Sequence, residues 1–387
     1  MKNTHKIYYD NVHQTEFEAR VLECAAEEKT GRYRIILDKT AFFPEEGGQV
    51  ADAGFLDEQK VLDVQIKDDI IYHYTQAPFP EGHTVRGRVD WAQRFDFMQQ
   101  HTGEHILSGL VNAHYGYDNV GFHLGLSEVT LDFNKNLSLE QLRAIEVLAN
   151  QAVWADLPVY VSTPSPDALS RMTYRSKIAL DKGVRIVEIP GVDICACCAP
   201  HVESTGQIGL IKITGAQSHR GGVRVTILCG NRALSDYTKK QDAVSGISAL
   251  LSAKPEDTPQ AVKRLLSENA ALKARTGQLQ AKLLSQQIKD LPSPEETDHV
   301  VLFTGDLDSI ALRNAVNTLT KDYPGFCAIF AGDDKSGYRY VIGSAGKDCR
   351  ELAQRLGQRF QAKGGGSAPM VQGSISAPES DIRSFFQ

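Results

Sequence analysis

The sequence predicts a mixed α+β protein made of four consecutive parts. Three patterns support this prediction: short apolar runs between turn residues at the beginning, helical spacing from about residue 91, and a long helix-forming stretch ahead of a last region in which strands and helices alternate. With 387 residues, of which 42% are hydrophobic and 23% charged, the chain is long enough to bury more than one core.

The first part, residues 1–90, is expected to be a β-rich, barrel-like domain. Its apolar runs at 33–37, 61–66 and 70–74 are separated by Gly, Asp and Pro, which favour turns. Short strands at this spacing are typical of a small barrel or a curled sheet.

The second part, residues 91–235, is expected to be an α+β domain that binds zinc. Residues 94–115 have helical spacing, which places His101 and His105 near one face of a helix. The other elements expected here are a strand at 128–133, a helix at 138–154 that begins at Ser138, and strands within 184–230.

The third part, residues 236–290, is expected to be a helical linker that resembles a coiled coil. Its apolar residues approximate a heptad stripe, formed by Val262, Leu265, Leu272, Leu279 and Leu283. Between residues 261 and 289, six basic residues stand against the single acidic residue Glu268. The basic residues are Lys263, Arg264, Lys273, Arg275, Lys282 and Lys289.

The fourth part, residues 291–387, is expected to be a separate α/β domain that follows a proline-containing hinge at its start. The elements expected in it are strands at 299–303, 327–331 and 338–343 and a helix at 349–361. A glycine-rich run follows at 363–373, and residues 376–387 are expected to form a tail.

Two pairs of candidate metal ligands are the most informative motif. His101 and His105 are four residues apart, as are Cys197 and His201. Residues i and i+4 of a helix have Cβ atoms about 5–6 Å apart, so both can reach one ion. Three imidazoles and a thiolate suit zinc. Whether such a site is structural or catalytic stays open at this stage, and Cys198 and Cys195 are weaker alternatives to Cys197 as the sulfur ligand.

A second motif lies at residues 38–54, which read Asp-Lys-Thr-Ala-Phe-Phe-Pro-Glu-Glu-Gly-Gly-Gln-Val-Ala-Asp-Ala-Gly. Two interpretations stay open. Gly47 and Gly48 beside acidic residues suit a hairpin turn. They equally suit a loop whose backbone approaches a substrate closely, with the amide of Gln49 as donor and acceptor.

The two motifs together resemble those of the alanyl-tRNA editing family, which comprises the editing domain of alanyl-tRNA synthetase and its free-standing AlaX relatives. The run from Cys197 to Gly209, Cys-x3-His-Val-x-x-Thr-Gly-x-Ile-Gly, resembles the second zinc motif of that family. Residues 364–373 resemble the end of the DHHA1 module of its long members. Because the glycine-rich motif begins near residue 38, the chain is expected to be a long, free-standing AlaX-type protein without a synthetase catalytic domain.

The resemblance implies a zinc-dependent hydrolase that removes a wrong amino acid, serine or glycine, from alanine tRNA. Thr102 and Glu104, within the first zinc motif, are the candidate catalytic residues, and Glu104 departs from the uncharged residue common in the family. The candidate substrate-binding residues are Gln49, Gly47, Gly48, His123 and Arg224. For Arg224, the competing interpretation is a solvated arginine at a strand end.

The resemblance also implies that tRNA is a partner and that the chain forms a homodimer through the helical linker or the C-terminal domain. The candidate tRNA-binding residues are Lys263, Arg264, Lys273, Arg275, Lys282, Lys363, Gly364 and Gly365. Basic residues of this kind contact phosphates without reading sequence. The competing interpretation of the basic helix is the solvated outer face of a coiled coil.

Two other functions remain open. His101-Thr-Gly-Glu104-His105 also fits the His-x-x-Glu-His motif of inverted zinc peptidases, in which the glutamate acts as general base and a carboxylate is the third ligand. The chain would otherwise be a tRNA-binding protein with a purely structural zinc. These alternatives differ in the substrate that is hydrolysed, if any.

Composition bounds the compartment and the partners. The formal net charge of −6 disfavours a protein that coats nucleic acid, although it allows a local basic patch. The odd number of seven cysteines suits thiols in a reducing compartment. Neither a signal peptide nor an apolar run of about 18 residues is evident, so a cytoplasmic protein without a membrane segment is expected.

Overall fold

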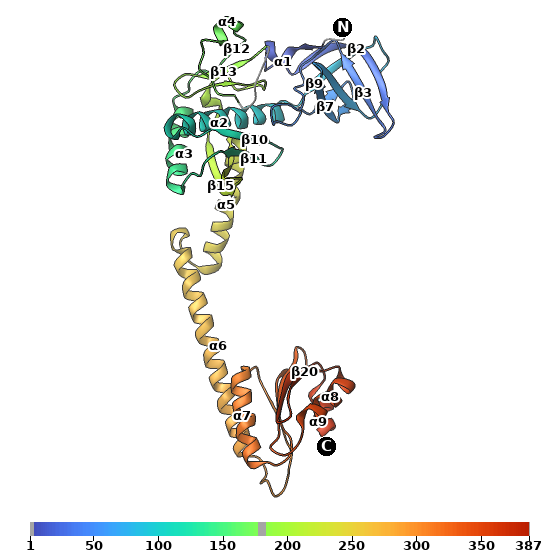
Figure 1. Ribbon diagram of the computed structural model, residues 1–387, viewed down its shortest axis with the longest axis vertical. Helices are drawn as coiled ribbons and strands as arrows, with labels where there is room; N and C mark the ends of the chain where they lie inside the picture. The colour runs from blue at the N-terminus through green and yellow to red at the C-terminus, as the bar shows by residue number, and fades with distance from the viewer. Residues whose placement is uncertain (1–3, 177–182, 387) are drawn as a thin grey trace. The chain divides into compact units, whose positions relative to one another are not determined.

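The computed structural model describes residues 4–176 and 183–386. The chain divides into two compact units, Met1–Ala243 and Val244–Gln387. Both mix helices with sheets, as the predicted α+β class requires (Figure 1). The finer division at residues 90, 235 and 290 stays a prediction. No helix in the described ranges is long and apolar enough to cross a membrane.

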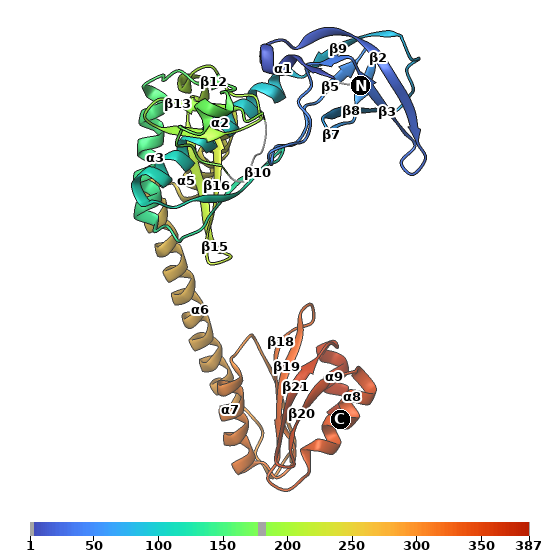
Figure 2. The same ribbon diagram turned by 45° about the horizontal axis from the view of Figure 1, so that its top comes forward.

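The first unit begins with a seven-stranded antiparallel sheet in the order β6-β5-β9-β2-β3-β8-β7 (Figure 2). Its strands are β2 (Glu16–Glu27), β3 (Arg32–Leu37), β5 (Gly54–Leu56), β6 (Gln59–Val61), β7 (Asp63–Lys67), β8 (Ile70–Thr75) and β9 (Thr84–Val89). The edge strand β6 continues almost directly into the opposite edge strand β7 and also contacts β8, so the sheet curls into a barrel-like form. A short parallel pair, β1 (His5–Lys6) and β4 (Lys39–Thr40), and the single turn α1 (Ile7–Asp10) lie beside it.

The long helix α2 (Trp91–Tyr115) follows and is largely buried. The Asp90 side chain accepts a hydrogen bond from the backbone N–H of Gln93 at its start, and Gly116 ends it with a φ of +66°. α2 contacts β10, β14 and β16, which belong to two different sheets. The two sheets therefore hold α2 from both sides.

The four-stranded sheet has the order β10-β11-β16-β15, and the three-stranded sheet has the order β12-β13-β14. Their bounds are β10 (Asn119–Leu124), β11 (Val129–Phe133), β12 (Tyr160–Ser162), β13 (Ile186–Ile189), β14 (Asp193–Ala196), β15 (Ile211–His219) and β16 (Gly222–Cys229). The helices are α3 (Leu139–Trp154), α4 (Pro166–Leu169) and the short 3-10 helix η1 (Thr205–Ile208). Ser138 and Gln141 form a capping box at the start of α3.

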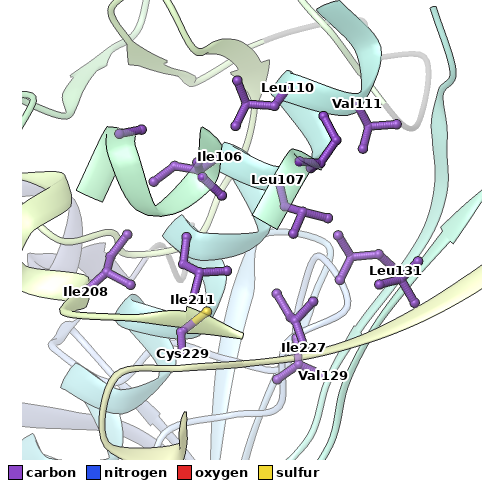
Figure 3. Close-up of a cluster of buried hydrophobic side chains, with 14 of the residues drawn as sticks. Ile106, Leu107, Leu110, Val111, Val129, Leu131, Ile208, Ile211, Ile227 and Cys229 are labelled. Atoms are coloured by element: carbon purple, nitrogen blue, oxygen red, sulfur yellow. The ribbon is translucent and has the colours of Figure 1, made fainter. Parts of the chain in front are cut away.

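The core of this region lies between α2, α3 and the four-stranded sheet. Apolar side chains from α2 meet those from β11, β15 and β16, with Ile208 of η1 beside them (Figure 3). The residues labelled there are Ile106, Leu107, Leu110, Val111, Val129, Leu131, Ile208, Ile211, Ile227 and Cys229. This packing fixes the face of α2 that remains for the functional site.

A fully buried ion pair joins the glycine-rich motif to α2. Arg94 Nε donates to both carboxylate oxygens of Asp52 at 3.1 Å, and neither side chain is exposed. The same guanidinium donates to the backbone oxygens of Val12 and Ala41. A buried pair of this kind persists where further hydrogen bonds satisfy both partners, and here it fixes the start of α2 against the first sheet.

The expected helical stretch at 236–290 contains two helices, α5 (Gly230–Leu251) and α6 (Thr258–Lys289). Between them Ser252 has a φ of +48°, and the 3-10 turn η2 (Pro255–Asp257) begins with a proline. A left-handed residue and a proline both interrupt helical hydrogen bonding. The heptad stripe therefore lies entirely within α6.

The second unit contains a five-stranded sheet in the order β17-β18-β19-β21-β20. Its strands are β17 (Val300–Thr304), β18 (Cys327–Asp333), β19 (Gly337–Gly343), β20 (Lys363–Ser367) and β21 (Met370–Ile375). α6 and α7 (Ser309–Asp322) cover one face, and α8 (Cys349–Phe360) and α9 (Glu379–Phe386) cover the other (Figures 1 and 2).

The expectation of a tail at 376–387 is wrong for the described residues. Residues 379–386 form α9, in which Ile382 is fully buried. Phe385 and Phe386 pack against rings of Phe360 and Phe330. The helix forms because this apolar face has a partner surface on the sheet, which no short-range pattern reveals.

Candidate metal centre

Four side chains from distant segments converge beside α2. His101 and His105 lie one turn apart, with ring centroids separated by 5.6 Å, and both are buried. Cys197 follows β14, and its Sγ lies 3.4 Å from His101 Nε2 and 3.3 Å from His201 Nε2. One donor atom from each of the four residues lies within 4.8 Å of the others. The structure thus brings together the four residues proposed as ligands from their spacing.

Each imidazole of the cluster is held through its other ring nitrogen. His101 Nδ1 donates to Gln49 Oε1 over 2.8 Å, and His105 Nδ1 donates to Asp193 Oδ2 over 2.9 Å. An amide or carboxylate oxygen only accepts, so these hydrogen bonds place a proton on Nδ1 and leave Nε2 as the ring atom that faces the cluster and could bind a metal ion. His201 Nδ1 lies 3.0 Å from Thr102 Oγ1.

This arrangement fits a metal ion. Metal-binding histidines characteristically donate their second ring N–H to an oxygen, which fixes the tautomer and the ring plane. Three nitrogens and one sulfur are the donors that zinc prefers. The His/Cys cluster could therefore hold a metal ion.

The charges within the cluster favour the thiolate form of Cys197. Burial raises the pKa of Cys197, but the adjacent rings of His101 and His201 outweigh burial and hold that pKa well below its usual value. Burial lowers the pKa of His201 to about 3. Burial also opposes protonation of His105, yet hydrogen bonds to Asp193 and Cys197 raise its pKa well above the usual value. A thiolate is the form of cysteine that binds metal.

Asp193 holds the ring of His105 in place and is itself held by Arg175. Arg175 donates to its two carboxylate oxygens over 2.7 Å and 2.8 Å. Burial raises the pKa of Asp193, but the hydrogen bonds from His105 and Arg175 lower it further than burial raises it. Asp193 and Cys195 alternate along β14 and so lie on one face, and Cys197 follows directly after the end of this strand. His105, Asp193 and Cys195 form an overlapping group of possible ligands, in which Asp193 is already engaged by Arg175.

Cys198 faces away from the cluster. A Cβ on Gly47 would lie 3.1 Å from its Sγ, so this thiol packs on the glycine-rich turn. Burial, followed by the charge of Cys197, raises the pKa of Cys198. The pKa values of the neighbouring thiols of Cys197 and Cys198 are therefore shifted in opposite directions.

The two candidate catalytic residues are both buried beside the ligands. Thr102 contacts His201 and accepts the backbone N–H of Val202. Glu104 Oε1 accepts hydrogen bonds from Ser108 and Asn119, each 2.7 Å long. Glu104 Oε2 lies 3.9 Å from His105 Nε2, which places this carboxylate at the border of the cluster.

The glycine-rich motif forms a tight hairpin turn. Gly47 and Gly48 have φ values of +62° and +82°, and Glu46 pairs with Gln49 across the turn. A Cβ on Gly48 would lie 2.4 Å from the Phe122 backbone oxygen, so the turn packs directly on β10. The turn thereby positions Gln49 against His101, which gives the motif a role in the site through its shape.

Two other candidate substrate-binding residues lie elsewhere. His123 is exposed, whereas the ring of its neighbour Phe122 lies 4.7 Å from the His101 ring. Successive strand residues point to opposite faces, so Phe122 and not His123 borders the cluster. Arg224 lies in the interior of β16 and donates to both carboxylate oxygens of Asp132, at 2.6 Å and 2.7 Å. It is therefore neither at a strand end nor simply solvated.

All candidate tRNA-binding residues lie in the second unit and are exposed. Five of them lie on α6, namely Lys263, Arg264, Lys273, Arg275 and Lys282. Lys363, Gly364 and Gly365 lie on the edge strand β20.

Sequence motifs missed several residues of the site. They are Asp193, Arg175, Phe122, Ser108 and Asn119. Only Asp193 could have been found from the sequence, because it alternates with Cys195 in a short strand pattern immediately before Cys197. The others reach the site only through the fold.

Comparison with known proteins identifies the class first. Residues 184–225, which include Cys197 and His201, match the model of the "Threonyl and Alanyl tRNA synthetase second additional domain". Residues 1–93 match the model of "tRNA synthetases class II (A)". The chain thus shares two regions with proteins of the aminoacyl-tRNA synthetase class.

Individual relatives show more closely which proteins this chain is similar to. The alanine–tRNA ligase of Pyrococcus abyssi is 31% identical over 97% of this chain and 42% of its own length. The alanyl-tRNA editing protein Aarsd1 of Rattus norvegicus is 28% identical over 89% of this chain and 85% of its own length. The chain is similar in sequence to alanyl-tRNA synthetases and to alanyl-tRNA editing proteins, which confirms the resemblance of its motifs.

The chain spans less than half of the length of the ligases that it matches. Among solved structures, the C-Ala domain of alanyl-tRNA synthetase from Aquifex aeolicus aligns with 22% of this chain and 82% of its own, at 20% identity and a TM-score of 0.20.

Proposed function

We propose that this protein hydrolyses the ester bond between a wrong amino acid, serine or glycine, and the terminal adenosine of alanine tRNA, with the help of zinc. The observation that carries the proposal is the cluster in which His101 and His105 direct Nε2 inward because their Nδ1 atoms are bound to other oxygens. A relative whose printed name is alanyl-tRNA editing protein supports the same role.

The proposed zinc ligands are His101, His105, Cys197 and His201, whose donor atoms are already close together. A zinc ion held there would supply Lewis acidity toward an ester carbonyl or an anchor for the amino or hydroxyl group of the substrate.

Side chains of this protein would orient the metal ligands and accept a proton during hydrolysis. Gln49, Asp193 and Thr102 hold the imidazoles in place through their Nδ1 atoms. Glu104, fixed by two hydrogen bonds on Oε1, presents Oε2 toward His105. We assign to Glu104 the acceptance of a proton from the attacking water, or of a hydrogen bond from the hydroxyl of a seryl group. A site that hydrogen-bonds a hydroxyl discriminates strongly against a substrate that lacks it.

The proposed partners are mischarged alanine tRNA and a second copy of the chain. The exposed basic residues of α6 and the exposed strand β20 would contact the phosphates. The peptidase alternative gains no support from the cluster, since a cysteine and a histidine stand where that mechanism requires a carboxylate ligand.

The deciding experiment compares hydrolysis of seryl-tRNA and alanyl-tRNA, both made with alanine tRNA. Wild-type protein should release serine much faster than alanine and should contain bound zinc. Cys197→Ala should lose both zinc and activity. Cys198→Ala is the matched control, because this adjacent thiol faces Gly47 and should be dispensable for zinc.

Two outcomes would contradict the proposal. If wild-type protein binds tRNA and zinc but releases no amino acid, it is a tRNA-binding protein with a structural metal. If Cys198→Ala loses zinc and Cys197→Ala retains it, the assigned ligand is wrong.

A further inference from the structure

The sulfur atom of the cluster needs a different kind of support from the imidazoles. Each histidine ring has a second nitrogen that contacts another side chain, and this contact fixes where the inward nitrogen points. A cysteine side chain has a single polar atom, so no second atom is left through which another residue could hold it. The position of Sγ of Cys197 therefore depends on the conformation of its backbone.

The segment that carries Cys197 and His201 lies outside helices and strands. β14 ends at Ala196, and residues 197–201 include Pro200, which has no backbone N–H to donate. The segment nevertheless bends enough to bring Sγ of Cys197 within 3.3 Å of Nε2 of His201. A nitrogen and a sulfur that bind the same zinc ion tetrahedrally are about 3.5 Å apart. The bend therefore holds the two atoms close to the separation that one ion requires.

The guanidinium of Arg185 holds this bend. Its Nη1 donates to the backbone oxygen of Cys197 over 3.0 Å and to that of Ala199 over 2.8 Å. Ala199 is fully buried, so its carbonyl oxygen has to find a partner within the protein. One nitrogen thus bridges two carbonyl groups and keeps the chain between them in a turn.

The fold places Arg185 beside this segment through two contacts. Arg185 immediately precedes β13, and its backbone oxygen accepts the N–H of Cys197, which extends the antiparallel pairing of β13 with β14. Its guanidinium carbon lies 5.1 Å from the centroid of the Tyr9 ring, as in a cation–π contact. The backbone pairing sets where the side chain starts, and the ring of Tyr9 limits where it ends.

We propose that Arg185 is a positioning residue of the metal centre, which directs Sγ of Cys197 toward the ion by holding residues 197–199 in their bend. The inference rests on the metal ligands of the proposed function and adds a residue that acts through the backbone. His101 and His105 lie on α2 and keep their own supports when Arg185 is lost. The defect of an Arg185 variant should therefore affect the sulfur ligand most.

Binding of cobalt(II) in place of zinc provides the test, because a thiolate bound to cobalt adds a charge-transfer band that imidazole ligands lack. Wild-type protein should show this band together with the strong visible bands of a four-coordinate ion. Arg185→Gln should lose most of the charge-transfer intensity at saturating cobalt. It should also bind cobalt roughly 10- to 100-fold more weakly, the usual effect of losing a supporting contact.

Two further variants separate positioning from a general effect on stability. Arg185→Lys should keep most of the charge-transfer band, because both carbonyl contacts come from one nitrogen and an ammonium group has three donors. Arg34→Gln is the matched control and should change neither the band nor the affinity. Arg34 is also half-buried, with its guanidinium carbon 5.0 Å from the centroid of the Tyr72 ring, but it lies on β3 and takes no part in the cluster. Circular dichroism of the metal-free proteins checks their folding.

Three results would overturn the inference. If Arg185→Gln keeps both the band and the affinity, the bend does not depend on this side chain. If Arg185→Gln binds cobalt weakly but shows the full band at saturation, or if Arg34→Gln loses as much, the effect is one of overall stability. If Arg185→Gln does not fold, Tyr9→Leu decides, since removal of the ring should weaken the band and the affinity in part, and unchanged values would contradict the role of Arg185.

The same spectra separate this inference from the proposed function. A wild-type protein without the charge-transfer band would overturn the set of metal ligands and the role of Arg185 with it. A wild-type protein that shows the band but releases no amino acid from tRNA would bear on the proposed function alone.

Discussion

At the scale of single residues, Asp193 constrains the metal centre most strongly. It accepts from His105 on one side and from Arg175 on the other, so that three residues form a continuous hydrogen-bonded series. The ring of His105 can neither rotate nor change tautomer without breaking the first of these bonds. The supporting layer thus determines where a ligand atom points.

We expect Asp193→Asn to lower the affinity for zinc by roughly 10- to 100-fold, the usual effect of losing the group that orients a ligand. Competition with a chromophoric chelator measures this affinity. Asp132→Asn is the matched control, because Asp132 pairs with Arg224 and takes no part in the cluster. Equal losses of affinity in the two variants would show that the effect is not specific to the cluster.

The sequence predicts the candidate metal ligands but not the residues that hold these ligands in place. The difference has one physical reason. The spacing of four within each ligand pair is a local property, which a helical or tight-loop pattern makes visible. Gln49 lies 52 residues from His101, and its approach depends on the glycine turn packing on β10. His123 was a candidate substrate-binding residue, but strand alternation places the ring of Phe122, and not that of His123, beside His101.

At the scale of elements, two glycines let α2 lie close to both of its sheets. A Cβ on Gly103 would lie 2.3 Å from Cys229 Sγ on β16. A Cβ on Gly109 would lie 2.4 Å from the Val192 backbone oxygen beside β14. Gly103 stands between the two histidines of α2, so its packing also sets the depth of the metal ligands.

We expect Gly103→Ala to reduce the free energy of unfolding by about 1–3 kcal/mol, the usual cost of overpacking a filled interior. Urea denaturation measures the change. Combining it with Cys229→Ala removes the clashing sulfur and should recover part of the loss. Gly246→Ala is the control, because a Cβ at this helical glycine meets nothing within 4 Å. A loss in Gly103→Ala that Cys229→Ala does not relieve at all would contradict this account.

The structure agrees with the sequence-based prediction for a helix with a local signal in its sequence. It disagrees for a helix whose stability depends on tertiary contacts. The helix expected at 138–154 corresponds to α3, whose capping box is visible in the sequence. The helix α9 was expected to be a tail, because its stability comes from burial of Ile382 on the sheet. A short segment gives little indication of the surface that it will contact.

At the scale of the whole molecule, charge is distributed very unevenly. The formal net charge is −6, yet the exposed part of α6 carries six basic residues and one acidic residue. Composition alone gives the total and not the surface on which it lies. The structure separates α6 into a side that packs on its own sheet, an apolar stripe and an exposed basic remainder.

This distribution predicts how tRNA binding responds to salt. Each phosphate contact that a basic residue makes contributes about 0.7–0.9 to the slope of log affinity against log salt concentration. The triple variant Lys263→Gln/Arg264→Gln/Lys282→Gln should therefore bind alanine tRNA more weakly, with a slope shallower by about that amount for every contact removed. None of these three residues belongs to the heptad stripe, so the apolar residues of α6 are unchanged. Arg32→Gln/Lys60→Gln/Lys67→Gln, which alters exposed residues of the first sheet, is the control of equal charge. An unchanged slope in the α6 variant, or an equal change in both, would assign the phosphate contacts to another surface.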